Sequence, residues 1–259
     1  MKRITQLKDE ALEALHGNFG KAALATLAFI LVYAVFEILL GLGQEQTDFS
    51  DIYSAMISGD YSALYDLYGG SPLRYLIGIL ASMFLFVPFT VGFSNSFRLL
   101  YQSKGSDNTL FRNFFRLGFG KSYLHIVWVM LVNTVLVTIL TTVAMIIPII
   151  LMIIIRNAVA TIIGVLLIIF LVFSILLMYS MVTYIVVDNP QLGAIETMRR
   201  SRQIMYGNKW RLIVLALSFL GWIILGIFTL GIGYLWLIPY MTTTESAFYC
   251  DVRDAEKAA

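Results

Sequence analysis

Residues 122–187 read SYLHIVWVMLVNTVLVTILTTVAMIIPIILMIII, then Arg156-Asn157, then AVATIIGVLLIIFLVFSILLMYSMVTYIVV. Arg156 is the only charged residue in this stretch. An α-helix needs roughly 20 apolar residues to cross the hydrocarbon core of a bilayer, so each half is long enough for a transmembrane helix. Arg156 and Asn157 follow Pro148 and predict an outer turn between two long or tilted helices. The stretch therefore predicts a helical hairpin that spans a membrane.

The composition of the whole chain agrees with this interpretation. Of the 259 residues, 59% are hydrophobic and 13% are charged, whereas soluble domains are roughly half apolar and about a quarter charged. A formal net charge of +2 does not favour a nucleic-acid-binding protein. Cys250 is the single cysteine, which excludes an internal disulfide and a site of several thiolates. We expect one integral membrane domain over residues 1–259.

Working outward from residues 122–187, three further stretches are depleted of charge. The last of them is either one long helix or a hairpin that turns at residues 229–233. Gly231 and Gly233 favour the hairpin, because glycine weakens a helix interior and permits a tight turn. The prediction is an all-α protein with six transmembrane helices arranged as three hairpins. The charge-depleted stretches are 22–43, 75–97, 122–155, 157–187 and 212–244, the last divided into 212–228 and 234–249.

The basic residues predict the orientation of these helices. Of the 18 lysines and arginines, all except Arg74 and Arg156 fall on the same side of the six-span arrangement. Short cytoplasmic loops retain basic residues, so this side and both termini are predicted to be cytoplasmic. The first apolar run begins after 21 residues of amphipathic sequence and is itself about 20 residues long, which does not resemble a cleavable signal. We expect it to remain in the mature protein.

A threefold internal pattern precedes the odd-numbered spans. Each copy has an amphipathic stretch, a glycine, an aromatic residue and a base before the span, as in Gly17, Gly118 and Gly207. A basic amphipathic helix beside a span typically lies in the headgroup plane. We therefore predict three cytoplasmic interfacial helices, each followed by a transmembrane hairpin. The pseudo-repeats run over about 4–97, 107–187 and 191–250.

Several short motifs occur along the chain, namely Leu12, Ala14, Leu15, Gly17 and Asn18, then 188–196, Ser201, 205–209, 218–222, 229–233 and 239–240. Together they resemble a family of bacterial membrane proteins, domain-of-unknown-function family 975. More remotely, this family is similar to the membrane domain of some bacterial glycerophosphodiester phosphodiesterases. That resemblance implies a multi-span bundle in the bacterial cytoplasmic membrane, but it transfers no catalytic residue.

Five arginines on two of the predicted interfacial helices are the candidate contacts to anionic lipid headgroups or to a partner protein. An arginine near an anionic membrane surface contributes about 1 kcal/mol to binding. The five are Arg112, Arg116, Arg199, Arg200 and Arg202.

Four polar residues within spans are candidate pathway residues. Glu37 is an ionisable residue near the outer end of the first span, where either a functional role or a solvated acid fits. Thr134, Thr138 and Thr141 form a polar stripe that either lines a pathway or joins helices by hydrogen bonds. The outer segment 44–72 is acidic and rich in tyrosine; it fits either a cationic ligand or an aromatic belt on the membrane.

Enzymatic chemistry finds little support in the sequence. His16 and His125 are the only histidines, and neither belongs to a metal-ligand spacing. We predict no catalytic residue, metal or cofactor. The leading hypothesis is a non-enzymatic membrane protein with a lipid-surface or partner-binding role in the cell envelope, and the alternative is a transporter of small solutes or lipids. A membrane partner or a homo-oligomer would be compatible with either.

Overall fold

The computed structural model describes residues 1–41, 53, 57–58, 72–106, 109–155 and 157–257, and within these ranges it contains helices and turns but no strand. The predicted outer segment 44–72 lies almost entirely outside the described residues. In chain order the elements are α1 (Ile4–Leu15), α2 (Phe19–Gly41), α5 (Pro72–Ala81), the π-helix η1 (Ser82–Phe86), α6 (Val87–Gln102), α7 (Leu110–Phe119), α8 (Tyr123–Ile155), α9 (Ala158–Tyr179), α10 (Val182–Asp188), α11 (Ala194–Met205), α12 (Lys209–Leu217), α13 (Leu220–Phe228) and α14 (Tyr234–Lys257).

Five helical segments of the described chain are long and apolar enough to cross a membrane, as expected of a membrane protein. The predicted sixth span, 234–249, is helical but is not among them. Its polar run from Thr242 to Ser246, which contains Glu245, lowers its hydropathy. The all-α fold is therefore confirmed, whereas six spans in three hairpins stays a prediction. The five segments are Phe19–Phe36, Leu76–Gln102, Tyr123–Ile155, Thr161–Asp188 and Lys209–Phe228.

Helices end and begin at both positions where the sequence predicts a turn. The Asn157 side chain accepts a hydrogen bond from the Val159 amide at 2.8 Å and caps the start of α9. At the other turn, Leu230 and Gly231 adopt left-handed backbone conformations between α13 and α14. Both turns place a residue suited to the required backbone at the break in the apolar pattern.

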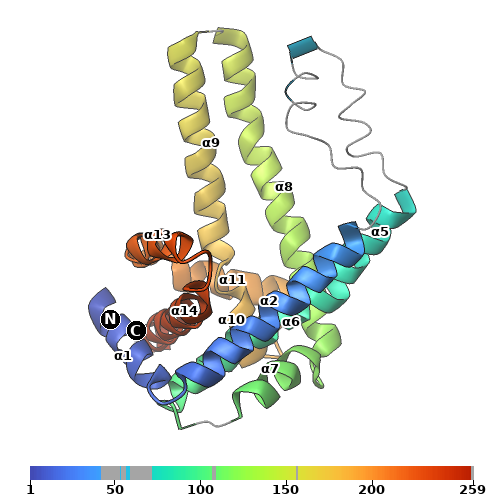
Figure 1. Cartoon of the computed structure of the whole chain (residues 1–259). Helices are drawn as coiled ribbons and strands as arrows, with labels where there is room; N and C mark the ends of the chain where they lie inside the picture. Colours follow the sequence, from blue (N-terminus) through green and yellow to red (C-terminus); the bar gives the residue numbers. More distant parts are fainter. Residues whose placement is uncertain (42–52, 54–56, 59–71, 107–108, 156, 258–259) are drawn as a thin grey trace.

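Helices α8 and α9 form a long hairpin that extends away from the other elements (Figure 1). With 33 residues, α8 is about 50 Å long at 1.5 Å per residue, which exceeds a typical hydrocarbon core. Most isoleucines near its tip are exposed, for example Ile147 and Ile154. Gly164 allows close packing of the pair, because a side chain there would collide with Met152. The exposed apolar surface is the kind that lipid covers.

The second span contains a π-helix that ends at Phe86, two residues before Pro88. Proline has no backbone N–H, so the carbonyl of Phe84 four residues earlier loses its helical partner. The Tyr123 hydroxyl donates a hydrogen bond to that carbonyl at 2.7 Å. The start of α8 thus satisfies the backbone group that the proline frees.

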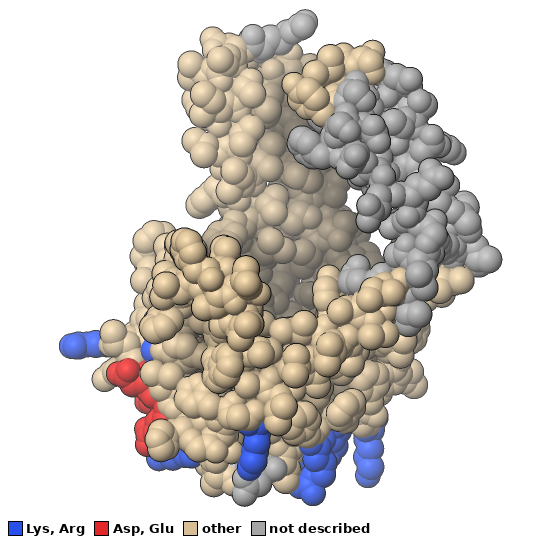
Figure 2. Space-filling model, in the orientation of Figure 1, with Lys and Arg blue, Asp and Glu red and all other residues tan. Residues whose placement is uncertain are grey.

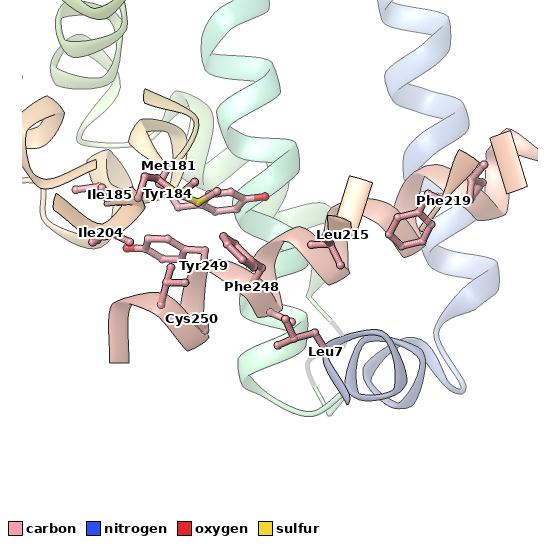
Figure 3. Close-up of a cluster of buried hydrophobic side chains, with 14 residues drawn as sticks. Leu7, Met181, Tyr184, Ile185, Ile204, Leu215, Phe219, Phe248, Tyr249 and Cys250 are labelled. Atoms are coloured by element: carbon pink, nitrogen blue, oxygen red, sulfur yellow. The ribbon is translucent and has the colours of Figure 1, made fainter. Parts of the chain in front are cut away.

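Helix α14 lies at the centre of the buried core. It contacts α1, α2, α6, α11 and α13, and it supplies several fully buried side chains to the largest apolar cluster (Figure 3). Burial on most sides explains why a helix with threonines and a serine packs here, since their hydroxyls bond to carbonyls of their own helix. The α14 residues with no exposed surface are Thr243, Thr244, Ser246, Ala247, Phe248 and Tyr249.

Similar turns join α1 to α2 and α11 to α12. Both leading helices have 12 residues, and Gly17 and Gly207 follow them with φ of 78° and 76°. Next comes a buried asparagine, Asn18 or Asn208, whose backbone carbonyl accepts the first hydrogen bond of the following helix. Glycine fits the left-handed conformation without strain. The threefold repeat itself stays a prediction.

Candidate functional site

Helix α7 presents two different apolar faces. Leu110, Phe114 and Gly118 are buried against α6, and the backbones approach so closely that a side chain at Gly118 would lie 2.3 Å from the Pro88 carbonyl oxygen. The helix therefore packs lengthwise on α6. A separate stripe at i, i+4 and i+8 remains on the surface; it consists of Phe111, Phe115 and Phe119.

The two arginines of α7 lie beside this aromatic stripe. Arg112 and Arg116 are exposed and have no ion pair among the described residues. Figure 2 shows basic side chains gathered along the edge of the molecule where α1 and α7 lie in Figure 1, while most of the rest of this view carries no charge. An exposed aromatic stripe with adjacent unpaired arginines fits the boundary between acyl chains and headgroups.

The three predicted arginines of α11 differ in their partners. Arg200 pairs with Glu256 of α14 at 2.8 Å. Arg199 lies 3.5 Å from Glu196, with both side chains at least half exposed. Arg202 is exposed and has no ion pair in the described part of the chain. Thus Arg200 has a structural partner, whereas Arg199 and Arg202 remain accessible.

A partly buried ionic cluster joins α6, α10 and α14. Asp188 accepts a hydrogen bond from Arg98 on one carboxylate oxygen, and the other oxygen accepts bonds from Tyr249 and Arg253, each at 2.8 Å. Arg98 is 3% exposed, and its Nε donates to Asn95 Oδ1 at 2.8 Å. The two arginines compensate the carboxylate, as buried charge requires. These contacts hold α6, α10 and α14 together.

Sequence reasoning missed the cluster. In the sequence, Arg98 and Arg253 are bases near the ends of spans, and Asp188 is part of a family motif. The available signal was an acid that ends one apolar run and an arginine that ends another. Charges at such positions can meet when the helices pack side by side.

A second polar network joins the two ends of the chain. Lys2 and Tyr101 both donate to Glu10 Oε2, at 2.7 and 2.6 Å. The Lys2 backbone N–H donates to the Asp251 carboxylate at 3.0 Å, and Arg211 donates to the same group at 2.8 Å. Burial raises the pKa of Glu10, but the hydrogen bonds from Lys2 and Tyr101 and the charge of Lys2 outweigh it, so that pKa lies below its ordinary value.

Lys8 contacts the two residues between α12 and α13, Ser218 and Phe219. Its ammonium donates to the Ser218 carbonyl at 3.2 Å and lies 4.3 Å from the centre of the Phe219 ring. Partial burial lowers the pKa of Lys8, although Asp9 opposes this effect. A carbonyl left open by the end of α12 thus gains a charged donor.

The three candidate pathway threonines all lie on α8. Thr134 and Thr138 are exposed on α8, and the Thr141 hydroxyl donates to the carbonyl of Val137 in its own helix at 2.8 Å. The backbone of Glu37 lies in α2, but its side chain is outside the described residues. No group of His, Cys, Asp or Glu in the described chain could hold a metal ion.

Comparisons with known proteins add one finding. Residues 1–256 match the model of a family described as protein of unknown function (DUF975). No curated protein and no solved structure matches the chain significantly.

Proposed function

The chain belongs to the DUF975 family, and we propose that it is a non-enzymatic protein of the bacterial cytoplasmic membrane that binds anionic lipid headgroups. The observation that carries the proposal is the outer side of α7. There Phe111, Phe115 and Phe119 form an exposed stripe, beside which Arg112 and Arg116 have no ion pair in the described chain. The aromatic rings would enter the acyl boundary, and the guanidinium groups would contact phosphates.

The accessible arginines of α11 extend the proposed contact. Arg199 and Arg202 are exposed, whereas Arg200 is held by Glu256. At about 1 kcal/mol for each arginine near an anionic surface, the α7 pair accounts for about 2 kcal/mol, or a roughly thirtyfold change in affinity. We therefore assign the main contact to Arg112 and Arg116.

The lipid experiment uses the full chain in detergent and two fluorescent lipids, phosphatidylglycerol and phosphatidylcholine. We expect Arg112→Gln/Arg116→Gln to weaken phosphatidylglycerol binding by roughly thirtyfold and to leave phosphatidylcholine binding unchanged. The matched control is Arg3→Gln/Lys104→Gln, which removes the same charge from exposed positions outside α7. Wild-type affinity in the α7 variant would refute the proposal, and so would an equal loss in both double variants.

We also propose that both termini are cytoplasmic. The contact between Lys2 and Asp251 supports this, because it holds the beginning and end of the chain together. An odd number of complete crossings would separate them. After five apolar segments, the chain must therefore return, either through α14 as a sixth crossing or because the hairpin of α12, α13 and α14 enters and leaves from one side.

Cysteine labelling in intact cells tests this topology in a Cys250→Ser background. Asn157→Cys, at the turn between α8 and α9, should react from outside. Thr5→Cys, exposed on α1, should react only after the cells are opened. Reaction of Thr5→Cys from outside would contradict the orientation. Leu230→Cys distinguishes the two forms of the last hairpin, because only a sixth crossing exposes this turn outside.

A further inference from the structure

The turn between α13 and α14 differs in polarity from the turn between α8 and α9. Residues 156–157, at the latter turn, are an arginine and an asparagine, whereas residues 212–244 contain no charged side chain. At the turn between α13 and α14 the large apolar side chains lie on the surface. Leu230 is 93% exposed, and Phe228 and Ile232 are exposed as well. An uncharged turn with an apolar surface fits acyl chains better than water.

The backbone of the same turn makes its hydrogen bonds within the hairpin. The N–H groups of residues 229–232 and of Tyr234 each donate to a carbonyl three to five positions earlier. The N–H of Gly233 donates to Thr229 Oγ1 at 2.9 Å. The Tyr234 hydroxyl joins the two arms by donating to the Ile223 carbonyl at 3.0 Å. Hydrocarbon offers no partner to a backbone N–H, so an embedded turn requires this internal pairing.

Lys8 of α1 marks the base of this hairpin. Its ammonium lies 4.3 Å from the centre of the Phe219 ring, just before α13, and 5.9 Å from the centre of the Tyr240 ring in α14. The two rings meet edge to face with centroids 5.1 Å apart. Both arms of the hairpin are therefore held at the level of one lysine.

The level of Lys8 lies near the water boundary of the membrane. Asp9 and Glu13 of the same helix are exposed, and exposed charges are costly at depth in a bilayer. Beyond this level, the nine residues of α13 extend about 14 Å at 1.5 Å per residue. A crossing of the hydrocarbon core requires about 30 Å. In Figure 1, α8 and α9 likewise extend farther from α1 than α13 does.

We propose that α12, α13 and residues 234–240 of α14 form a re-entrant hairpin, which enters and leaves the membrane from the α1 side. Its tip lies among the acyl chains near the middle of the bilayer. The complete crossings of the described chain are then α2, the segment from α5 to α6, α8 and α9. This inference rests on the proposed insertion of the chain in a membrane, and it selects one of the two forms that keep the termini together. It depends neither on lipid binding by α7 nor on which side of the membrane α1 faces.

The accessibility of a spin label measures the depth of the tip. The full chain in the Cys250→Ser background carries a nitroxide at Leu230→Cys and is reconstituted in phosphatidylcholine vesicles. Oxygen concentrates in hydrocarbon and a nickel chelate stays in water, so the ratio of the two collision rates reports depth. Nickel on both sides makes the ratio independent of protein orientation. The matched references are Phe170→Cys, exposed within α9, and Asn157→Cys, exposed at the polar turn.

We expect the label at Leu230→Cys to collide mainly with oxygen, as at Phe170→Cys, and to lose the nickel contact seen at Asn157→Cys. Nickel access equal to that at Asn157→Cys would overturn the re-entrant hairpin. Because Leu230 is exposed, its replacement removes little packing, and Ile232→Cys repeats the test at a second exposed position. Labelling of Thr5→Cys from outside the cell would contradict only the proposed orientation and would leave the depth of the tip unchanged.

Discussion

Helices α1 and α7 have similar amphipathic sequences, but the fold uses them differently. Both bury a column of residues at i, i+4 and i+8: Leu7, Ala11 and Leu15 in α1, and Leu110, Phe114 and Gly118 in α7. With these columns aligned, Arg112 and Arg116 of α7 correspond to Asp9 and Glu13 of α1. The exposed phenylalanines of α7 correspond to Lys8, Leu12 and His16.

An amphipathic helix beside a span is therefore not by itself a membrane-surface element. The apolar face of α1 is buried against α14 and α6, and its outer face is acidic. Acidic side chains are repelled by anionic lipids. Helix α7 has a second apolar face and a basic outer side, so it retains a surface for the membrane after its packing is complete.

The free energy of unfolding should fall most for a substitution in the buried column of α1 and hardly change for one in the outer stripe of α7. Leu7→Ala removes a side chain with no exposed surface and should lower the free energy of unfolding by about 2–5 kcal/mol. Phe115→Ala, at 55% exposure, should change it by less than about 0.5 kcal/mol. Denaturant unfolding in a fixed detergent measures both.

A large loss of unfolding free energy for Phe115→Ala would contradict the assigned difference between α1 and α7. It would mean that the outer stripe of α7 is covered in the folded protein and is not a free surface for lipid. A negligible loss for Leu7→Ala would instead mean that α1 is loosely attached and could leave the core. The two variants therefore test opposite halves of the same distinction.

Hydropathy and turn residues predicted most of the fold. Long apolar runs have few alternatives to transmembrane helices, and the turns at Asn157 and Gly231 follow local backbone preferences. The fate of α14 was harder to predict. Its apolar residues resemble a span, but the hydroxyls of Thr243, Thr244 and Ser246 fit because other helices enclose them, which is a property of tertiary packing.

The candidate site was predictable only where it depends on local sequence. The basic stripe of Arg112 and Arg116 follows from helical spacing within α7. The pairing of Arg98 with Asp188 depends on contacts between residues 90 positions apart, and charge counting cannot distinguish a loop arginine from a buried one. For the same reason, spacing alone does not indicate that α6 covers Phe114 while Phe111 and Phe115 stay exposed.

The smallest expected effect concerns the acidic side of α1 and its dependence on pH. Because the pKa of Glu10 is lowered in the folded protein, its carboxylate stabilises the fold above the ordinary glutamate pKa of about 4.3. This contribution is lost as pH falls from that value through the lowered pKa. Glu10→Gln should therefore reduce the unfolding midpoint slightly at neutral pH and flatten its decline in acid. Since Glu10 and Lys2 are both about a third or more exposed, solvent screening keeps the effect small.

Glu13→Gln is the matched control, because Glu13 lies on the exposed face of α1. Its unfolding midpoint should follow the wild-type curve. An identical change in both variants would mean that the acidic face acts through its total charge and not through the contact between the chain ends.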